Sequence, residues 1–246
     1  MRKILVGSAR RVGICMNAYA CQVSKNVIGF VSVLLLLNTN VLGTVIHVPD
    51  DRPTIQSGIA AAADGDTVLV APGTYVENVN FIGKNIVVAS HFVTTGDANF
   101  VETTIIDGSS PTNPDSASCV VMCSGEDSSA VLQGFTLTGG RGTRWHDDLY
   151  AHMTFRAGGG ILTYKSSPTI RDNIIINNEV TNMSGVEGAQ GGGLLCYYGN
   201  PLILNNVIAS NIALYGAGMV TDYSGGRIRG NIMCKNTAGQ SYGGGA

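Results

Sequence analysis

Charged residues are scarce in this sequence. They make up 13% of its 246 residues, about half the usual share of roughly 25%. The formal net charge is −2, and the isoelectric point is about 6.0. A nucleic-acid-binding protein normally carries a concentrated basic face, so this balance argues against nucleic acid as a partner.

A hydrophobic run long enough to cross a membrane is also missing. The run from Val27 to Leu37 is shorter than the roughly 20 residues of a membrane-spanning helix. Basic residues precede it, and residues small enough for cleavage precede Thr44, as is typical of a signal peptide. We therefore predict a signal peptide over residues 1–43, a secreted or cell-surface (extracellular or outer-membrane-associated) protein, and no stable membrane span after signal removal. Translation from Met16 would leave only Lys25 ahead of the run.

The six cysteines include no CxxC pair, so a zinc or thioredoxin-type site has no support. Cys119 and Cys123 are four residues apart on an expected strand, which places them on one face but too far apart to bridge easily. We expect the cysteines to be small, buried hydrophobic residues.

Glycine, in contrast, is abundant, with 33 residues, close to twice the usual share of about 7%. Low charge, many glycines and short apolar runs favour a β-solenoid over a helical domain, because a solenoid needs a tight turn at every corner. The 44% hydrophobic content argues against a disordered chain.

A 21-residue repeat occurs three times without gaps, over residues 158–178, 191–211 and 216–236. Each copy has a turn residue ten positions after its first glycine, and asparagines five and ten positions further on. The turn residues are Pro168, Pro201 and Gly226, and the asparagines are Asn173, Asn178, Asn206, Asn211, Asn231 and Asn236. Asparagine tolerates the left-handed backbone of a sharp corner, and stacked asparagines can exchange amide hydrogen bonds. We therefore predict that these six form a structural ladder.

A fainter copy precedes these three. Aligning Cys119 with Gly158 places Gly134 and Gly139 at the two asparagine positions. Residues two apart on a strand share a face, so the apolar columns of this alignment are predicted to line the interior. These columns contain Val131, Phe135 and Leu137; Ile170, Ile174 and Ile176; Ile203, Val207 and Ala209; and Ile228, Ile232 and Cys234.

The links between copies vary in length, so insertions are expected to leave the solenoid at one corner. A fourth copy opens at Gly243. We accordingly expect residues 44–246 to be one β-helix domain that is truncated at its C-terminal end. At its other end, a short helix capped by Thr54 and running through Ala63 is expected to cover the core. Strands are expected over residues 47–49, 67–71, 74–81, 86–90 and 103–107.

Residues 54–88, TIQSGIAAAADGDTVLVAPGTYVENVNFIGKNIVV, resemble the opening of pectin-lyase-like right-handed β-helix proteins. The GGGI…SSPTI…N…NN copies are similar to the parallel β-helix repeats of bacterial surface proteins. Together the resemblances cover roughly residues 44–246. They imply an all-β fold, a right-handed single-stranded parallel β-helix with a short N-terminal capping helix. The superfamily includes polysaccharide lyases, pectin methylesterases, polygalacturonases, phage tailspikes and non-enzymatic surface proteins, so the fold does not choose a function.

The resemblance does not extend to a catalytic site. Lyase relatives bind calcium through clustered carboxylates, and hydrolase relatives carry two or three acids on adjacent coils. Neither arrangement recurs at matching positions of the repeat. We therefore predict no metal site and no cofactor, with Ca²⁺ required only if the protein is a lyase.

One insertion, residues 141–157, stands apart because it contains the only tryptophan and two of the four histidines. Aromatic rings stack on sugars, and histidine, aspartate and arginine can bind ligands or transfer protons. The substrate-binding candidates are Arg144, Trp145, His146, Asp147, Asp148, His152 and Arg156. The simpler alternative is a solvated loop that Trp145 anchors to the solenoid flank. A second insertion, residues 179–190, is predicted to be a plain loop.

These observations favour a non-catalytic extracellular or cell-surface scaffold that presents its loops to a polysaccharide, a cell-surface glycan or another protein. The alternative is a carbohydrate-active enzyme, a polysaccharide lyase or hydrolase acting on acidic polysaccharide. A periplasmic carbohydrate-processing protein is a third possibility, and differs mainly in compartment.

Overall fold

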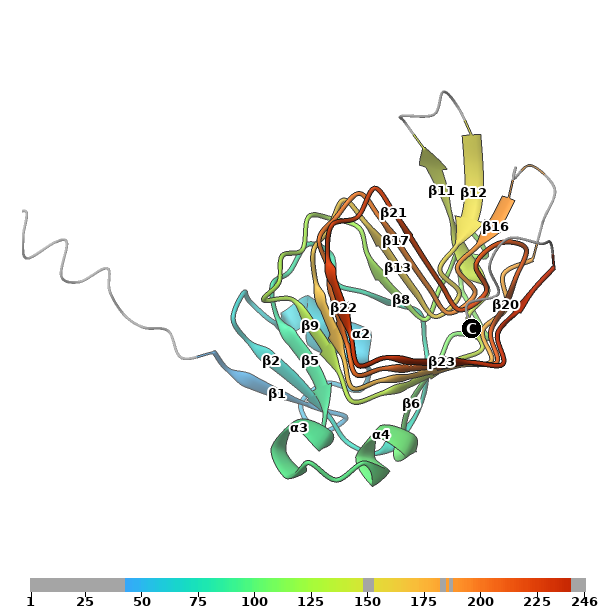
Figure 1. Ribbon diagram of the computed structural model, residues 1–246. Coiled ribbons are helices and arrows are strands. Elements are labelled where there is room, and N and C mark those ends of the chain that lie inside the picture. Colours follow the sequence, from blue (N-terminus) through green and yellow to red (C-terminus); the bar gives the residue numbers. More distant parts are fainter. Residues whose placement is uncertain (1–42, 148–152, 182–184, 186–187, 240–246) are drawn as a thin grey trace, which may run out of the picture. The chain divides into compact units, whose positions relative to one another are not determined.

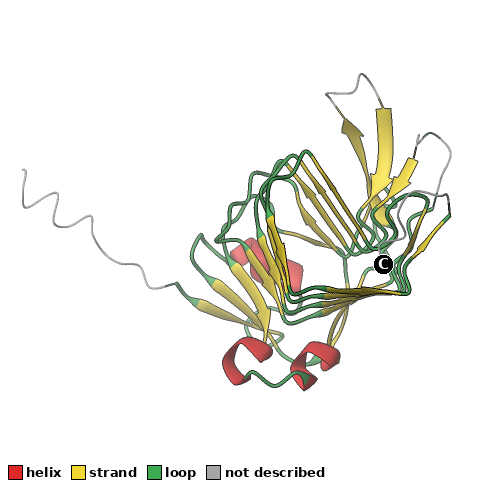
Figure 2. Ribbon diagram, in the orientation of Figure 1, coloured by secondary structure: helices red, strands yellow, loops and turns green. Residues whose placement is uncertain are grey.

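The computed structural model describes residues 43–147, 153–181, 185 and 188–239. Residues 1–42 of the predicted signal peptide, Asp148, His152 and the expected fourth copy at Gly243 lie outside the described residues. The described chain is all-β with stacked parallel sheets, an arrangement consistent with a β-solenoid (Figures 1 and 2).

Three parallel sheets carry most of the strands. Sheet A contains β1 (Val45–Val48), β2 (Thr67–Val70), β5 (Val87–Ser90), β9 (Val131–Gln133), β14 (Thr169–Arg171), β18 (Leu202–Leu204) and β22 (Arg227–Arg229). Sheet B contains β3 (Gly73–Val76), β6 (Thr104–Asp107), β10 (Thr136–Thr138), β15 (Ile174–Ile176), β19 (Val207–Ala209) and β23 (Ile232–Cys234). Sheet C contains β4 (Val79–Asn80), β8 (Val120–Met122), β13 (Ile161–Tyr164), β17 (Leu194–Tyr197) and β21 (Met219–Asp222). A short pair, β20 (Ile212–Ala213) and β24 (Thr237–Ala238), lies outside these sheets.

Each copy of the repeat contributes one strand to each of the three sheets, and equivalent residues pair between copies. In sheet A, Ile170 lies opposite Ile203, and Ile203 lies opposite Ile228. The three sheets share one interior core, in which Leu132, Leu137 and Val120 pack together with their partners in the next coil, Ile170, Ile175 and Ile161. Residues at equivalent positions of the three copies therefore also pair with one another between neighbouring strands. Ile228, predicted to line the interior, is 44% exposed.

The alignment of the fainter copy is wrong by one residue in sheets A and B and by two residues, in the opposite direction, in sheet C, where Val120 lies opposite Ile161 rather than Gly159. Leu132, rather than Val131, lies opposite Ile170, and Thr136, rather than Phe135, lies opposite Ile174. The reason is a longer corner. Residues 123–130 link β8 to β9, whereas residues 165–168 link β13 to β14. An alignment without gaps cannot accommodate that difference.

The predicted interior columns of sheet B are correct for Phe135 and Leu137 of the fainter copy but wrong for the three later copies. Ile175 and Ile208 are fully buried and belong to the interior core, whereas Ile174 and Ile176 are only partly buried and Ile232 is 60% exposed. The residue before each ladder asparagine has a left-handed backbone, which turns the chain and resets the alternation of its side chains. The asparagine therefore points inward together with the residue two positions later.

The left-handed residues are not the ladder asparagines, contrary to the prediction. One column of positive φ contains Gly134, Asp172, Asn205 and Gly230, and the other contains Gly139, Asn177, Ser210 and Lys235. Glycine, asparagine and aspartate tolerate this conformation best. The predicted ladder positions Gly134 and Gly139 fall in these columns, so Phe135 and Gly140 take the ladder positions of that coil.

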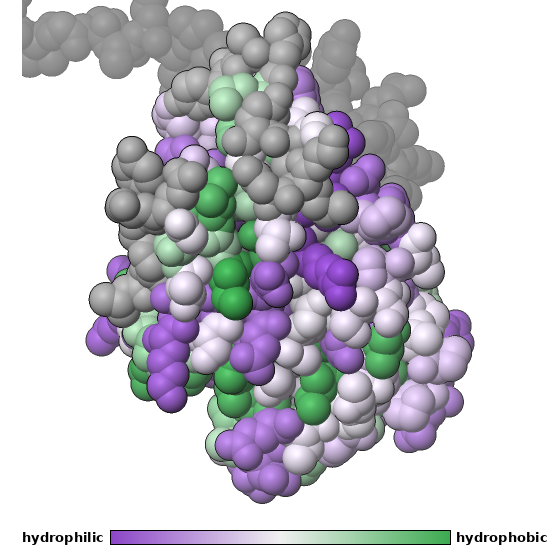
Figure 3. Space-filling view, turned by 90° about the vertical axis from the view of Figure 1, so that its right-hand side faces the viewer, coloured by the Kyte–Doolittle hydropathy of each residue, from purple (hydrophilic) through white to green (hydrophobic). Residues whose placement is uncertain are grey.

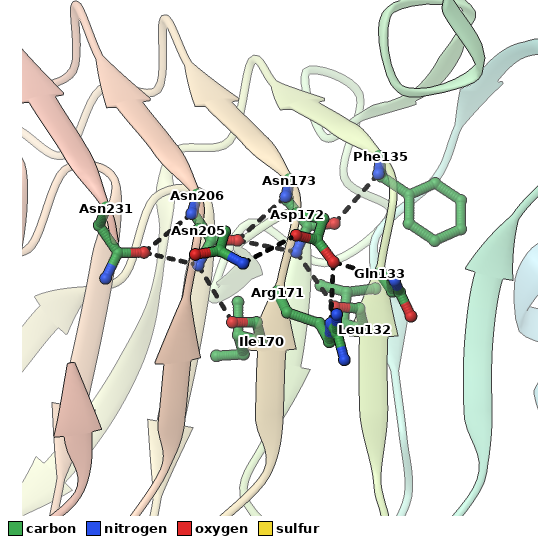
Figure 4. A network of polar contacts seen from close by, with 10 residues as sticks. All are labelled: Leu132, Gln133, Phe135, Ile170, Arg171, Asp172, Asn173, Asn205, Asn206 and Asn231. Carbon is green, nitrogen blue, oxygen red and sulfur yellow. Dashed lines mark hydrogen bonds and ion pairs between the residues drawn. The ribbon is translucent and has the colours of Figure 1, made fainter. Parts of the chain in front are cut away.

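The ladder asparagines form two lines of side-chain hydrogen bonds through the stack, and Figure 4 shows the first. The Oδ1 atom of Asn206 accepts from the backbone N of Asn173 at 3.0 Å and from its Nδ2 at 3.1 Å. The Nδ2 atom of Asn206 donates to Asn231 Oδ1 and to the Ile170 carbonyl, both at 3.0 Å. The second line joins Asn178, Asn211 and Asn236 in the same way. These amides thereby satisfy backbone groups at two corners of each of the three repeat copies.

Three short helices accompany the sheets: α2 (Ile55–Ala61), α3 (Phe92–Thr95) and α4 (Asn99–Thr103). Thr54 caps α2 through a reciprocal bond with Ser57, and the helix ends two residues before the predicted Ala63. Its buried residues Ile55 and Ile59 join the interior core. The predicted strand over residues 74–81 is divided between β3 and β4. None of the helices in the described residues is long and apolar enough to cross a membrane.

The cysteines differ in their surroundings. Cys119 and Cys196 are buried in the interior core, whereas Cys123 lies just beyond β8, where strand alternation no longer holds, and packs on the opposite side of sheet C. Cys234 is exposed, which corrects the prediction that the cysteines are buried. It faces outward because it follows the inward-facing Met233 on β23.

The buried thiols are expected to weaken the fold at alkaline pH. Burial raises the pKa of Cys119 and Cys196 from 9.0 to about 12. Above pH 9 the unfolded chain therefore releases protons that the folded chain keeps, and stability falls as the pH rises toward 12. At pH 10.5 the loss is on the order of 2 kcal/mol for each thiol.

Denaturant unfolding at pH 8 and pH 10.5, under reducing conditions, measures this loss. The variant carrying Cys119→Ala and Cys196→Ala should lose less stability over this interval than the parent protein, whatever its stability at pH 8. The exposed-thiol control, Cys234→Ala, should match the parent. Equal losses in all three proteins would contradict the expectation.

Candidate functional site

The insertion at residues 141–157 forms a β-hairpin rather than the predicted loop. Strand β11 (Gly142–Asp147) pairs antiparallel with β12 (Met153–Ala157), and Trp145 lies opposite Phe155. The second insertion is not a plain loop either, because its β16 (Gly188–Gln190) pairs with β12. With β7 (Ser116–Ala117) these strands form a side sheet, which projects from one corner of the stacked coils (Figure 1). Alternation along β11 sends Trp145 and Asp147 to one face and Arg144 and His146 to the other.

Trp145 anchors the hairpin to the outer face of sheet C. Its side chain is 9% exposed, and its ring centroid lies 5.5 Å from Phe155, 5.3 Å from Tyr164 and 4.7 Å from Tyr197. Leu162 and Leu195 belong to the same second hydrophobic cluster. Trp145 Nε1 and Tyr164 Oη are among the buried side-chain atoms of the described residues that have no hydrogen-bond partner, so apolar and ring contacts hold Trp145 in place.

Asp147 is also turned toward the protein. The residue is 1% exposed, and its Oδ2 atom accepts a hydrogen bond of 3.0 Å from the Tyr197 hydroxyl. Burial raises the pKa of Tyr197 well above its usual range, and the adjacent Asp147 carboxylate raises it further. Tyr197 therefore stays protonated and can keep donating to Asp147.

Arg156 holds the base of the hairpin. The residue is 3% exposed; its Nη1 atom donates to the carbonyls of Pro114 at 2.7 Å and Gly142 at 2.8 Å. Its Nη2 atom lies 3.0 Å from Asp115 Oδ1 in an ion pair. A guanidinium with this set of partners positions the chain segment around residues 114 and 115, and it is turned away from solvent.

Arg144 and His146 face solvent. Arg144 Nη2 donates to the Gly185 carbonyl at 3.2 Å, and His146 Nδ1 lies 3.2 Å from Thr154 Oγ1. The hairpin thus brings five of the seven candidates onto two strands but divides them between two faces. Asp148 and His152 lie outside the described residues. Within the described part of the chain, no group of three or more His, Cys, Asp or Glu residues is placed to hold a metal ion.

The tyrosines of sheet C were missed by sequence reasoning. Tyr164 and Tyr197 occupy the same position in successive copies of the repeat, directly under the hairpin. Tyr198 and Tyr223 form a similar column at the next corner; their rings stack with centroids 4.8 Å apart and planes 12° apart. Their recurrence in the repeat was a usable signal, because like residues stack on like in successive coils.

The described residues therefore define a class of protein: an all-β chain of stacked parallel sheets with a β-hairpin packed against one outer face. Comparison with protein-family models, curated proteins and solved structures found no match to the chain.

Proposed function

We propose that this protein is a secreted or cell-surface β-helix scaffold that binds glycans without modifying them. In this proposal the helix is right-handed, belongs to the pectin-lyase-like superfamily, and is capped at its N-terminal end by α2. The resemblance of residues 54–88 supports the family, and that segment spans α2 to β5. Hydrophobic residues form small separate groups among hydrophilic ones on the face shown in Figure 3, which suits a surface exposed to water.

The observation that carries the proposal is the burial of three hairpin side chains. Three of the candidates for substrate contact are each at least nine-tenths buried: Trp145, Asp147 and Arg156. Their side chains contact other residues of the protein. Side chains used in this way fix the hairpin on the scaffold. Contacts to a glycan then come from residues exposed on the surface of the scaffold, and the proposal includes no cofactor.

The second candidate, a lyase or hydrolase acting on acidic polysaccharide, is favoured by a polar pocket at the corner where the hairpin begins. The pocket has a volume of about 320 Å³. It combines a carboxylate, Glu179, with the guanidinium of Arg141, and Ser109, Asn177 and Thr181 complete its polar side chains. A carboxylate can exchange a proton with a sugar, and a guanidinium, which stays protonated, can bind the carboxylates of an acidic polysaccharide. Ca²⁺ would be required only if the protein is a lyase.

Incubation with polygalacturonate and with alginate separates the two candidates. In parallel reactions with Ca²⁺ and with EDTA, the scaffold proposal predicts retention of the protein on one of the two polysaccharides and no new unsaturated or reducing ends. Turnover that Glu179→Gln or His146→Ala abolishes would establish the enzyme instead. Thr181→Ala, at the pocket wall, serves as the matched control for a change in pocket shape.

A further inference from the structure

A groove crosses the outer face of sheet A, away from the hairpin. Its volume is about 420 Å³, and Leu202, Leu204, Asn205, Arg227 and Arg229 line it. The register explains its shape. Leu202 lies opposite Arg227 and Leu204 lies opposite Arg229, so two short apolar side chains stand beside two long cationic ones. The leucines form a floor along β18, and the arginines form a wall along β22. We call this the Arg–Leu groove.

The two arginines of the wall carry charge that no described carboxylate neutralises. Both are exposed on β22. Among the described residues, the arginine–carboxylate ion pairs are Arg156–Asp115 and Arg171–Asp172, and neither includes Arg227 or Arg229. The two share one face of a strand, with α-carbons separated by about 6.6 Å at a rise of roughly 3.3 Å per residue. Like charges held this close repel each other, and an anionic ligand would relieve that repulsion.

Arg171, across the leucine floor, provides a contrast. Its Nε atom lies 2.8 Å from Asp172 Oδ2, which also accepts from Gln133 Nε2 at 2.9 Å (Figure 4). Asp172 Oδ1 is 3.4 Å from Asn205 Nδ2. The charge on this side of the floor is therefore balanced within the protein. The cationic character of the groove comes from β22 alone.

We propose that the Arg–Leu groove binds the acidic groups of an anionic polysaccharide. Arg227 and Arg229 pair with carboxylate or sulfate oxygens, a geometry for which the guanidinium fork is well suited. The floor of Leu202 and Leu204 receives the apolar face of a sugar ring. This inference rests on the proposed glycan-binding function for its class of ligand, and adds the place and the charge of that ligand. Two arginines in a protein of net charge −2 lack the broad basic face that a nucleic-acid backbone requires.

Binding to polygalacturonate, measured by calorimetry with the full chain at low ionic strength, tests the proposal. Replacing one wall arginine with alanine should weaken binding about tenfold, and replacing both about a hundredfold, since each removes a charge-assisted contact. The double Arg227→Lys, Arg229→Lys variant keeps the charge and should retain part of the affinity. Arg171→Ala is the matched control and should bind as the parent does. Methyl-esterified polygalacturonate should bind weakly, and dextran sulfate shows whether sulfate replaces carboxylate.

The outcomes separate this inference from the broader function. If the parent protein binds polygalacturonate or dextran sulfate and the double alanine variant binds equally well, the groove assignment is wrong while glycan binding stands. If the parent binds neutral dextran and the esterified polymer but neither anionic probe, the groove is again wrong. If the parent binds none of these polymers, the glycan-binding function and the groove assignment both fail. Thermal unfolding of each variant establishes that it is folded.

Discussion

Replacing Asn206 with alanine is expected to lower the free energy of unfolding by about 3 kcal/mol or more. The side chain is fully buried and takes part in four hydrogen bonds to the coils on either side. Its removal leaves the Asn173 amides, Asn231 Oδ1 and the Ile170 carbonyl without that partner, and each unsatisfied buried group costs roughly 1–3 kcal/mol. Urea denaturation measures the loss.

The neighbouring Asn205 supplies the control. Its backbone is left-handed, with φ of 55°, and Gly134 and Gly230 hold the same corner in other coils. Asn205→Gly therefore keeps the conformation and loses one weak contact of 3.4 Å. Its stability should stay within about 1 kcal/mol of the parent. If Asn206→Ala and Asn205→Gly lowered the free energy of unfolding equally, the hydrogen bonds of the ladder would not be what makes asparagine important here, and the expectation would be wrong.

Replacing Gly193 with alanine is expected to have a comparable effect, about 3 kcal/mol, because the added methyl group would collide with the next coil. A Cβ atom at this position would lie 2.5 Å from the Gly218 carbonyl oxygen, 2.8 Å from Ile208 Cγ2 and 2.9 Å from Asn211 Nδ2. The first of these belongs to the backbone of the following coil. Relief requires the coils to separate, which disturbs the second asparagine line as well.

Gly73→Ala is the matched control for the glycine prediction. A Cβ atom there would first meet the Tyr75 ring at 3.5 Å, an ordinary contact distance. The substitution should leave stability unchanged or raise it by up to about 1 kcal/mol, since alanine restricts the unfolded chain. Thermal unfolding compares the two variants. A Gly193→Ala protein as stable as Gly73→Ala would contradict the close stacking of the coils at this corner.

The repeat copies could be predicted from the sequence because successive coils of a solenoid carry like residues at equivalent positions. The asparagine spacing gave the register of the three later copies. The spacing could not show whether the ladder asparagine or the residue before it has the left-handed backbone, because both arrangements repeat with the same spacing. That ambiguity reversed the faces of Ile174 and Ile175. The longer corner at residues 123–130 shifted the fainter copy for a related reason, because length differences at corners leave the strands intact.

The candidate site was less predictable. The position of Trp145 as an anchor could be anticipated from its large apolar surface. Its partners could not, because Tyr164 and Tyr197 come from coils that follow the hairpin in the sequence. The burial of Asp147 depends on the Tyr197 hydroxyl in the same way. Pairing between distant segments decides whether a polar side chain faces solvent or protein, and the local sequence of the insertion does not contain that pairing.

Fluorescence of Trp145, the only tryptophan in the chain, tests most directly whether the hairpin is packed on sheet C. The packed hairpin predicts a blue-shifted emission that iodide and acrylamide quench little, and that moves to longer wavelength only when the whole fold unfolds. The Tyr197→Ala variant should increase the quenching, because it removes the nearest ring, whose centroid is 4.7 Å away. An emission typical of a water-exposed indole, quenched freely in the folded protein, would contradict this packing. The hairpin residues would then again be candidates for contact with a substrate.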